Sequence, residues 1–175
     1  MNEYRQLVIV AGTGRNSGKT TLVCNILEKF SHLKPLAVKI SPHLHKASQD
    51  ILLVKSQEGF LIYRETSLEG IKDTSRMLVS GASESYYIHA YDHYIGEAFN
   101  WFVENIAAER AIVCESPSLR KYINPGVFII ADSDRITEKR DFGELASLAD
   151  LTHRFNHTKT LPGCLHYSDG GWTCI

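Results

Sequence analysis

The residues with the clearest chemistry form a glycine-rich loop near the N-terminus of the 175-residue chain, GTGRNSGKT at positions 12–20. Glycines let consecutive backbone N–H groups curl around a phosphate, and Lys19 adds a point charge for the β- and γ-phosphates. The Thr20 hydroxyl can bind Mg²⁺ beside them. The loop therefore predicts a site for Mg²⁺ with GTP or ATP, in which the nucleotide is bound by Gly14, Arg15, Asn16, Ser17, Gly18, Lys19, Thr20 and Thr21.

The segments on either side of this loop are of the kind that a phosphate-binding loop needs. Positions 7–11 form a continuous apolar run, which is typical of a central parallel strand buried on both faces. Apolar residues then recur at helical spacing over 22–30, which predicts a helix that begins near Ser17. The strict GxxxxGK[ST] pattern has glycine where this chain has Thr13, so a chance glycine-rich turn is the alternative. A dinucleotide-binding fold is disfavoured, because it needs an acidic residue where Lys39 stands.

Three further side chains could act beside the loop. Glu115 follows an apolar strand, at the edge where ligands bind in open α/β sheets, and could hold Mg²⁺ or orient a water molecule. Lys39 ends the second predicted strand and could reach the γ-phosphate or a substrate anion; for both residues the alternative is an ordinary charged side chain at a strand end. Asp73 is either a carboxylate near the metal or a helix N-cap. We predict catalytic roles for Lys19, Glu115 and Lys39, and metal ligation by Thr20, Glu115 and Asp73.

Other polar positions are open to two interpretations. His43 and His45 alternate in a loop and could bind a substrate or be solvated, since two histidines alone do not make a zinc site. Asp132 and Asp134 follow another apolar strand and could face a guanine edge or cap a turn. An Asn-Lys-x-Asp motif, which marks common GTPases, is missing from the sequence, and the C-terminal His and Cys spacings match no common zinc pattern.

The remaining chain alternates β-branched runs with segments of helical period, which predicts one α/β domain over 1–175. The expected architecture is a three-layer P-loop NTPase domain with a mainly parallel sheet and an edge β-hairpin. Asp92 is expected to cap the strongest amphipathic helix. The expected strands are 7–11, 36–40, 86–88, 111–114 and 127–131, the hairpin is 51–54 with 60–63, and the helices cover 72–80, 95–106 and 142–148.

Composition narrows the function classes. With 19 Lys and Arg against 20 Asp and Glu, the net charge of −1 argues against general binding of nucleic acid or an anionic membrane. No apolar run is long enough for a membrane span, and the N-terminal sequence does not look like a signal peptide, so a cytoplasmic protein is expected. The four cysteines imply no disulfide framework.

The loop sequence GTGRNSGKTT resembles that of the SIMIBI class of P-loop NTPases, which includes dethiobiotin synthetases and cobyrinic-acid amidoligases. Lys39 with the nearby histidines, KDTSR at 72–76 and SGA at 80–82 are similar to the MobB family, nucleotide-binding accessory proteins of molybdopterin-guanine dinucleotide biosynthesis. The similarity extends over roughly the first two-thirds of the chain. The chain departs from that family at ISP, 40–42, and at ESP, 115–117, where the family usually has Glu-Gly.

The resemblance implies an accessory protein in molybdenum cofactor assembly that binds a nucleoside triphosphate and acts beside a nucleotidyltransferase partner. A homodimer is also expected from the resemblance. Hydrolysis should be slow, because no arginine finger or water-ordering glutamine can be identified in the sequence. Two alternatives remain: an ATP-dependent ligase or small-molecule kinase resembling dethiobiotin synthetase, and a partner-binding module that merely retains the loop.

Overall fold

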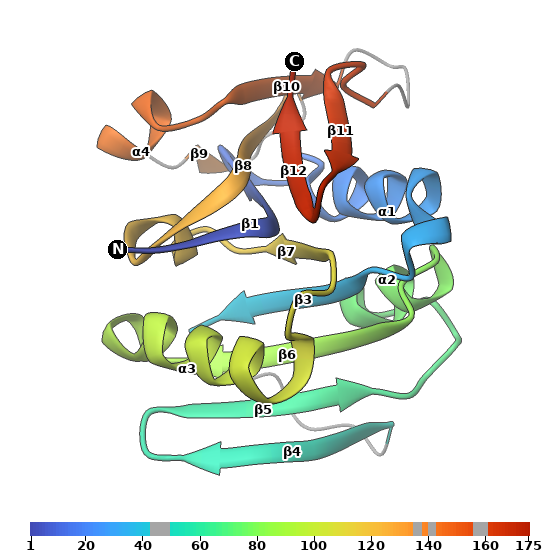
Figure 1. Cartoon of the computed structure of the whole chain (residues 1–175), viewed down its shortest axis with the longest axis vertical. Helices are drawn as coiled ribbons and strands as arrows, with labels where there is room; N and C mark the ends of the chain where they lie inside the picture. The colour runs from blue at the N-terminus through green and yellow to red at the C-terminus, as the bar shows by residue number, and fades with distance from the viewer. Residues whose placement is uncertain (43–49, 135–137, 140–142, 156–160) are drawn as a thin grey trace.

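The computed structural model of the chain describes residues 1–42, 50–134, 138–139, 143–155 and 161–175. Within these residues one sheet contains β1 (Asn2–Gly12), β3 (Leu36–Ser41), β4 (Ile51–Gln57), β5 (Phe60–Glu65), β6 (Glu84–Ala90), β7 (Ile112–Glu115), β8 (Ile123–Ser133) and β10 (Leu151–Phe155). Their order across the sheet is β10-β8-β1-β7-β3-β6-β5-β4 (Figure 1). The first six strands in this order are parallel, and β5 and β4 add an antiparallel hairpin at one edge. The predicted α/β architecture with a mainly parallel sheet and an edge hairpin is therefore confirmed.

Helices cover both faces of the sheet, and the alternation of side chains along β1 shows why. Leu7, Ile9 and Ala11 pack with α3 (Ile95–Phe102), whereas Val8 and Val10 point to the other face, toward α1 (Lys19–Lys29) and α2 (Asp73–Val79). A central strand buried on both faces must be apolar throughout, as this one is. The α3 helix starts after a 3₁₀ turn, η2 (Asp92–Tyr94), and continues as a π-helical turn, η3 (Val103–Ala107). No described helix is both long and apolar enough to cross a membrane.

Smaller elements complete the described chain. Two short sheets pair β2 (Gly14–Arg15) with β9 (Glu138–Lys139) and β11 (Leu165–Ser168) with β12 (Gly171–Cys174). The second hairpin closes the core on the α1 side, where Trp172 is buried and its Nε1–H donates to the Gln6 carbonyl oxygen at 2.9 Å. The short helical turns are η1 (Ser31–Leu33), η4 (Leu119–Lys121) and α4 (Glu144–Ser147).

Four details differ from the sequence-based expectations. The helix after the glycine-rich loop begins at Lys19 rather than near Ser17, because Gly18 has a left-handed backbone with φ of 85°. Asp92 lies in a 3₁₀ turn and makes no capping hydrogen bond to α3, whose N-cap position is Tyr94. The last predicted helix is only the single turn of α4. Cys164 and Cys174 form a disulfide across the C-terminal hairpin, although no disulfide was expected.

Candidate functional site

The glycine-rich loop leaves the carboxyl end of β1 and folds tightly over it. A Cβ atom on Gly12 would lie 2.0 Å from Ser17 Oγ and 2.3 Å from Lys19 Cγ, so no other residue fits there without a rearrangement. Asn16 and Gly18 both have positive φ, 64° and 85°, which turns successive peptide groups around the loop. Ser17 is fully buried inside the turn. The loop thus has the compact form expected of a backbone cradle at the start of a helix.

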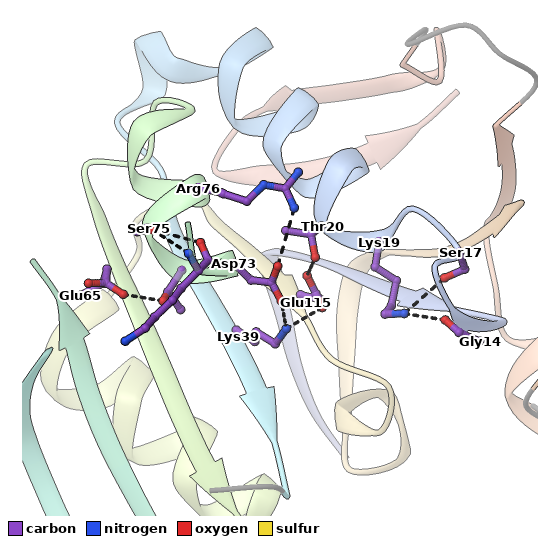
Figure 2. Close-up of polar contacts among 12 residues, drawn as sticks. Gly14, Ser17, Lys19, Thr20, Lys39, Glu65, Asp73, Ser75, Arg76 and Glu115 are labelled. Carbon is purple, nitrogen blue, oxygen red and sulfur yellow. Dashed lines mark hydrogen bonds and ion pairs between the residues drawn. The ribbon is translucent and has the colours of Figure 1, made fainter. Parts of the chain in front are cut away.

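Lys19 lies across this loop. Its Nζ donates to the Gly14 carbonyl oxygen at 2.7 Å and to Ser17 Oγ at 3.3 Å (Figure 2). Hydrogen bonds between an ammonium and phosphate oxygens are stronger than those to neutral oxygens. A phosphate group at the loop would therefore compete well for the Lys19 ammonium.

Thr13, which stands where the strict pattern has glycine, ties the loop to the neighbouring strand β8. Its N–H donates to the Ala131 carbonyl oxygen at 3.0 Å, and its hydroxyl donates to Asp132 Oδ1 at 2.6 Å. Asp134 accepts a hydrogen bond from Arg154. Both carboxylates thus have partners within the fold, a hydroxyl of the loop for Asp132 and a guanidinium for Asp134.

The other predicted loop residues occupy distinct places. Gly14 is buried and Arg15 is exposed, and both pair in β2 with β9. Asn16 is exposed at its left-handed position, and Gly18 is the N-cap residue of α1. Lys19, Thr20 and Thr21 form the first turn of that helix. The predicted nucleotide-binding residues therefore follow one continuous path from the edge of the sheet into α1.

A polar network brings the other predicted residues together beside the loop. The Thr20 hydroxyl donates to Glu115 Oε2 at 2.7 Å, and Lys39 Nζ lies 3.2 Å from Glu115 Oε1 (Figure 2). The Lys39 ammonium also donates to Asp73 Oδ2. Arg76 Nη1 lies 3.7 Å from the second oxygen of Asp73. Lys39 is thereby placed between two carboxylates.

The sheet explains how these residues meet. Lys39 near the end of β3 and Glu115 at the end of β7 are register partners in adjacent parallel strands. Val10 of β1 is in turn the partner of Glu115. Asp73 begins α2, which packs on the same face as α1. The carboxyl ends of three neighbouring strands and the starts of two helices therefore surround one point.

Burial and charge act in opposite directions on this network. Burial favours a lower pKa for the Lys39 ammonium, but attraction to Glu115 and the hydrogen bond to Asp73 outweigh it and raise that pKa above its ordinary value. Burial would raise the pKa of the Asp73 carboxyl, whereas the hydrogen bond and charge of Lys39, together with the charge of Arg76, lower it. The charged forms of Lys39 and Asp73 are therefore mutually stabilised.

The oxygen atoms of Thr20 and Glu115 fit adjacent positions on Mg²⁺. Octahedral Mg²⁺ with bonds of 2.0–2.1 Å places neighbouring ligand oxygens about 2.9 Å apart, and Thr20 Oγ1 and Glu115 Oε2 are 2.7 Å apart. No group of three or more His, Cys, Asp or Glu side chains suited to a metal occurs among the described residues. A magnesium ion bound by Thr20 and Glu115 would have its remaining positions filled by phosphate oxygens and water, as is common for this ion.

An open cleft of about 1030 Å³ adjoins the loop and the network. Its charged lining comprises five cationic side chains and three carboxylates, although the whole chain carries a net charge of −1. The lining therefore carries an excess of positive over negative side chains. These charged residues are Arg15, Lys19, Lys39, Arg120 and Lys121, with Asp92, Glu115 and Glu144.

Three cationic residues near the site were not predicted from the sequence, and two predicted candidates cannot be placed. Arg76, Arg120 and Lys121 were missed, although the last two follow Glu115 by only five and six positions and a strand-end acid is a signal to inspect the turn after it. His43 and His45 lie outside the described residues.

Comparisons with family models, with curated protein sequences and with solved structures give no match for this chain. The residues around the loop are therefore the basis for the function proposed below. Their chemistry is that of cations, a hydroxyl and two carboxylates at the carboxyl edge of a parallel sheet, which is where ligands bind in open α/β folds.

Proposed function

We propose that the chain is a P-loop nucleotide-binding protein that binds GTP or ATP together with Mg²⁺. Lys19 would contact the β- and γ-phosphates, and the backbone N–H groups of the loop would surround them. Thr20 and Glu115 would hold Mg²⁺, with Asp73 beside them. A Mg²⁺ ion held there would supply positive charge that neutralises the phosphates.

One observation above all supports this proposal. The hydroxyl at the start of α1 and the carboxylate at the end of β7 come from positions 95 residues apart, yet they form a 2.7 Å hydrogen bond beside the glycine-rich loop. A chance glycine-rich turn would not require a magnesium-compatible pair of oxygens next to its lysine. The combination of loop, lysine, hydroxyl and strand-end carboxylate is the set that nucleoside triphosphates with Mg²⁺ use.

Slow hydrolysis of the bound triphosphate would agree with the residues found around the loop. Fast GTPases use a glutamine to orient the attacking water. Among the described glutamines, Gln6 donates to the Ala108 carbonyl oxygen and Gln57 donates to Glu97, so both are engaged elsewhere. A protein that binds the triphosphate and turns it over slowly suits an accessory role like that of MobB in molybdenum cofactor assembly, with a nucleotidyltransferase as partner. We carry that role over from the resemblance of the sequence motifs.

Titration calorimetry with GTP and ATP, each with and without Mg²⁺, tests the proposal. We expect Mg²⁺-dependent binding that Lys19→Ala weakens by about 1–3 kcal/mol, the loss of a charge-assisted hydrogen bond to phosphate. Lys34→Ala, at an exposed lysine after η1, is the matched control and should bind like the wild type. Preference for GTP would support the MobB-like role, whereas preference for ATP would favour a ligase or kinase resembling dethiobiotin synthetase. If neither nucleotide binds, the proposal is wrong.

A further inference from the structure

The turn that follows Glu115 forms a second cationic wall of the cleft. Ser118, Arg120 and Lys121 line the same cleft as Lys19 and Lys39. These three residues come from one short stretch of chain, because η4 begins only four positions after Glu115. We call this set the η4 wall.

The η4 wall is firmly attached to the edge of the sheet. The N–H of Ser116 donates to the Val10 carbonyl oxygen at 3.1 Å, which joins the turn to β1. The Ser116 hydroxyl is buried and accepts a hydrogen bond from the Leu119 N–H at 3.0 Å, which sets the direction of η4. Leu119 itself is fully buried in the core. The cations of the wall therefore project from a fixed base.

Arg120 keeps donors for a ligand while it is anchored. Its Nη1 donates to the Ile123 carbonyl oxygen at 3.2 Å and to Asn124 Oδ1 at 2.8 Å. A guanidinium group carries five N–H donors, and Arg120 uses Nη1 for both of these hydrogen bonds to described residues. The Nη2 and Nε donors have the geometry that binds a carboxylate or phosphate with two parallel hydrogen bonds. Lys121 is exposed next to it and adds a second positive charge.

The size of the cleft allows more than one occupant. Its volume of about 1030 Å³ lies at the upper limit of ordinary small-molecule sites, which are about 300–1000 Å³. Glu115 adjoins both groups of cations in the cleft, because it accepts a hydrogen bond from Thr20 at the end of the loop and precedes Ser118 of the η4 wall by three positions. The η4 wall lies close to Glu115, because the five residues from Glu115 to Arg120 span at most about 18 Å even when fully extended. An anion at each group would place the two ligands side by side.

From this arrangement we propose that the η4 wall binds a second small molecule that carries an oxyanion, a carboxylate or a phosphate, while the nucleotide occupies the loop. The inference rests on the proposed function for its first ligand. The second ligand is expected to be an anion because Arg120 and Lys121 offer N–H donors and positive charge, and Ser118 offers a hydroxyl. The anionic group would lie near Glu115 and Lys39, next to the terminal phosphate.

The test uses a protein already saturated with a non-hydrolysable GTP or ATP analogue and Mg²⁺, whichever nucleotide binds more tightly. Inorganic phosphate and, separately, acetate are then titrated at constant ionic strength in chloride. We expect one of the two anions to bind the wild type, which also identifies the preferred oxyanion. The double variant Arg120→Gln/Lys121→Gln should weaken that binding tenfold or more and change the affinity for the analogue less than twofold.

Since Arg120 also makes two hydrogen bonds within the fold, Lys121→Gln alone serves as a second variant and should weaken anion binding at least threefold. Lys34→Gln is the control for the loss of an exposed positive charge. Unchanged anion binding in both wall variants, or no anion binding to the wild type, would overturn the inference. Loss of analogue affinity in the wall variants would assign the wall to the nucleotide and also overturn it.

Failure of the proposed function gives a different result. In that case the analogue does not bind the wild type at all. The same anion titration is then carried out on Lys19→Ala, in which the cation of the loop is missing. Anion binding to this protein that is lost on adding Arg120→Gln/Lys121→Gln would support the η4 wall by itself, and binding that is insensitive to those changes would contradict it.

Discussion

Removal of the Lys39 charge should destabilise the protein, because one ammonium neutralises two carboxylates. The substitution Lys39→Met keeps the length of the side chain and removes only its charge and donors. Lys39 Nζ lies 3.2 Å from Glu115 Oε1. With an effective dielectric constant of 20, the Coulomb attraction between these two charged groups is about 5 kcal/mol before the cost of desolvation is subtracted. Breaking a buried pair costs about 3–5 kcal/mol. The Lys39 side chain is 18% exposed and that of Asp73 38%, so solvent screens part of the attraction. We therefore expect Lys39→Met to lower the free energy of unfolding by about 2–3 kcal/mol.

The same substitution should create affinity for a divalent cation without nucleotide. In Lys39→Met the carboxylates of Asp73 and Glu115 and the hydroxyl of Thr20 would remain together, with the positive charge between them removed. Oxygen ligands of this kind suit Mg²⁺ and Mn²⁺. Mn²⁺ should therefore bind the variant more tightly than the wild type and recover part of the lost stability, because a ligand that binds only the folded state stabilises it.

Urea unfolding followed by circular dichroism, with and without Mn²⁺, measures the stability, and electron paramagnetic resonance of free Mn²⁺ measures the binding. Lys34→Met, at an exposed site, is the control and should change neither quantity. A double-mutant cycle with Asp73→Asn should show a coupling of about 1 kcal/mol or more between Lys39 and Asp73. Wild-type stability of Lys39→Met together with unchanged Mn²⁺ affinity would refute the assignment of Lys39 as the neutralising cation.

Three further results are expected. Gly12→Ala should lower the free energy of unfolding by about 1–3 kcal/mol and abolish nucleotide binding, because its Cβ would overlap side-chain atoms of the loop; Gly163→Ala, where a Cβ would meet no atom within 4 Å, is the control. The lowered pKa of Asp73 makes its charged form stabilise the fold above the unfolded value of about 3.9, and this contribution disappears as the pH falls through the folded pKa. The wild type should therefore exceed Asp73→Asn in stability at pH 6 and lose that advantage toward pH 2, as measured by urea unfolding across this range. Cys174→Ser should lower the free energy of unfolding by about 2–3 kcal/mol, since the disulfide closes a loop with a sequence separation of 10. In urea unfolding, a reductant should lower the stability of the wild type and leave that of the variant unchanged.

The parts of the site that the sequence predicted are those set by local pattern and strand direction. The buried run of β1, the loop and the apolar stripe of α1 follow one another in the chain. The short loop therefore requires α1 to start at the carboxyl end of β1. Lys39 and Glu115 could be placed at the same edge because carboxyl ends of parallel strands share one edge. Lys39 and Glu115 are register partners because β7 lies between β1 and β3 in the sheet. This strand order is seen in the structure and could not be predicted from the sequence pattern.

Some of the parts that the sequence did not predict depend on residues that are distant in the chain. The bond between Thr13 and Asp132 joins residues 119 positions apart, and the pairing of β2 with β9 crosses a similar interval. The disulfide was missed because the sequence analysis expected a cytoplasmic protein, in which cysteines are more often free thiols, as the buried Cys24 and Cys114 are. The missed residues Arg120 and Lys121 belong to a turn whose direction is set by the buried Ser116 hydroxyl. The Thr13–Asp132 bond and the β2–β9 pairing depend on tertiary packing, whereas the disulfide and the η4 turn join residues that are close in the chain.

Lys39 also links nucleotide and metal in the proposed complex. Without ligands, its ammonium neutralises part of the charge of Asp73 and Glu115. A Mg²⁺ ion that takes Glu115 as a ligand adds two positive charges where Lys39 already lies, and like charges at such distances repel strongly. The terminal phosphate would relieve that repulsion, because it would offer Lys39 a new anionic partner beside the metal. Mg²⁺ and the triphosphate should therefore bind cooperatively, and a diphosphate, which lacks the terminal group, would leave Lys39 and Mg²⁺ in competition for the same carboxylate.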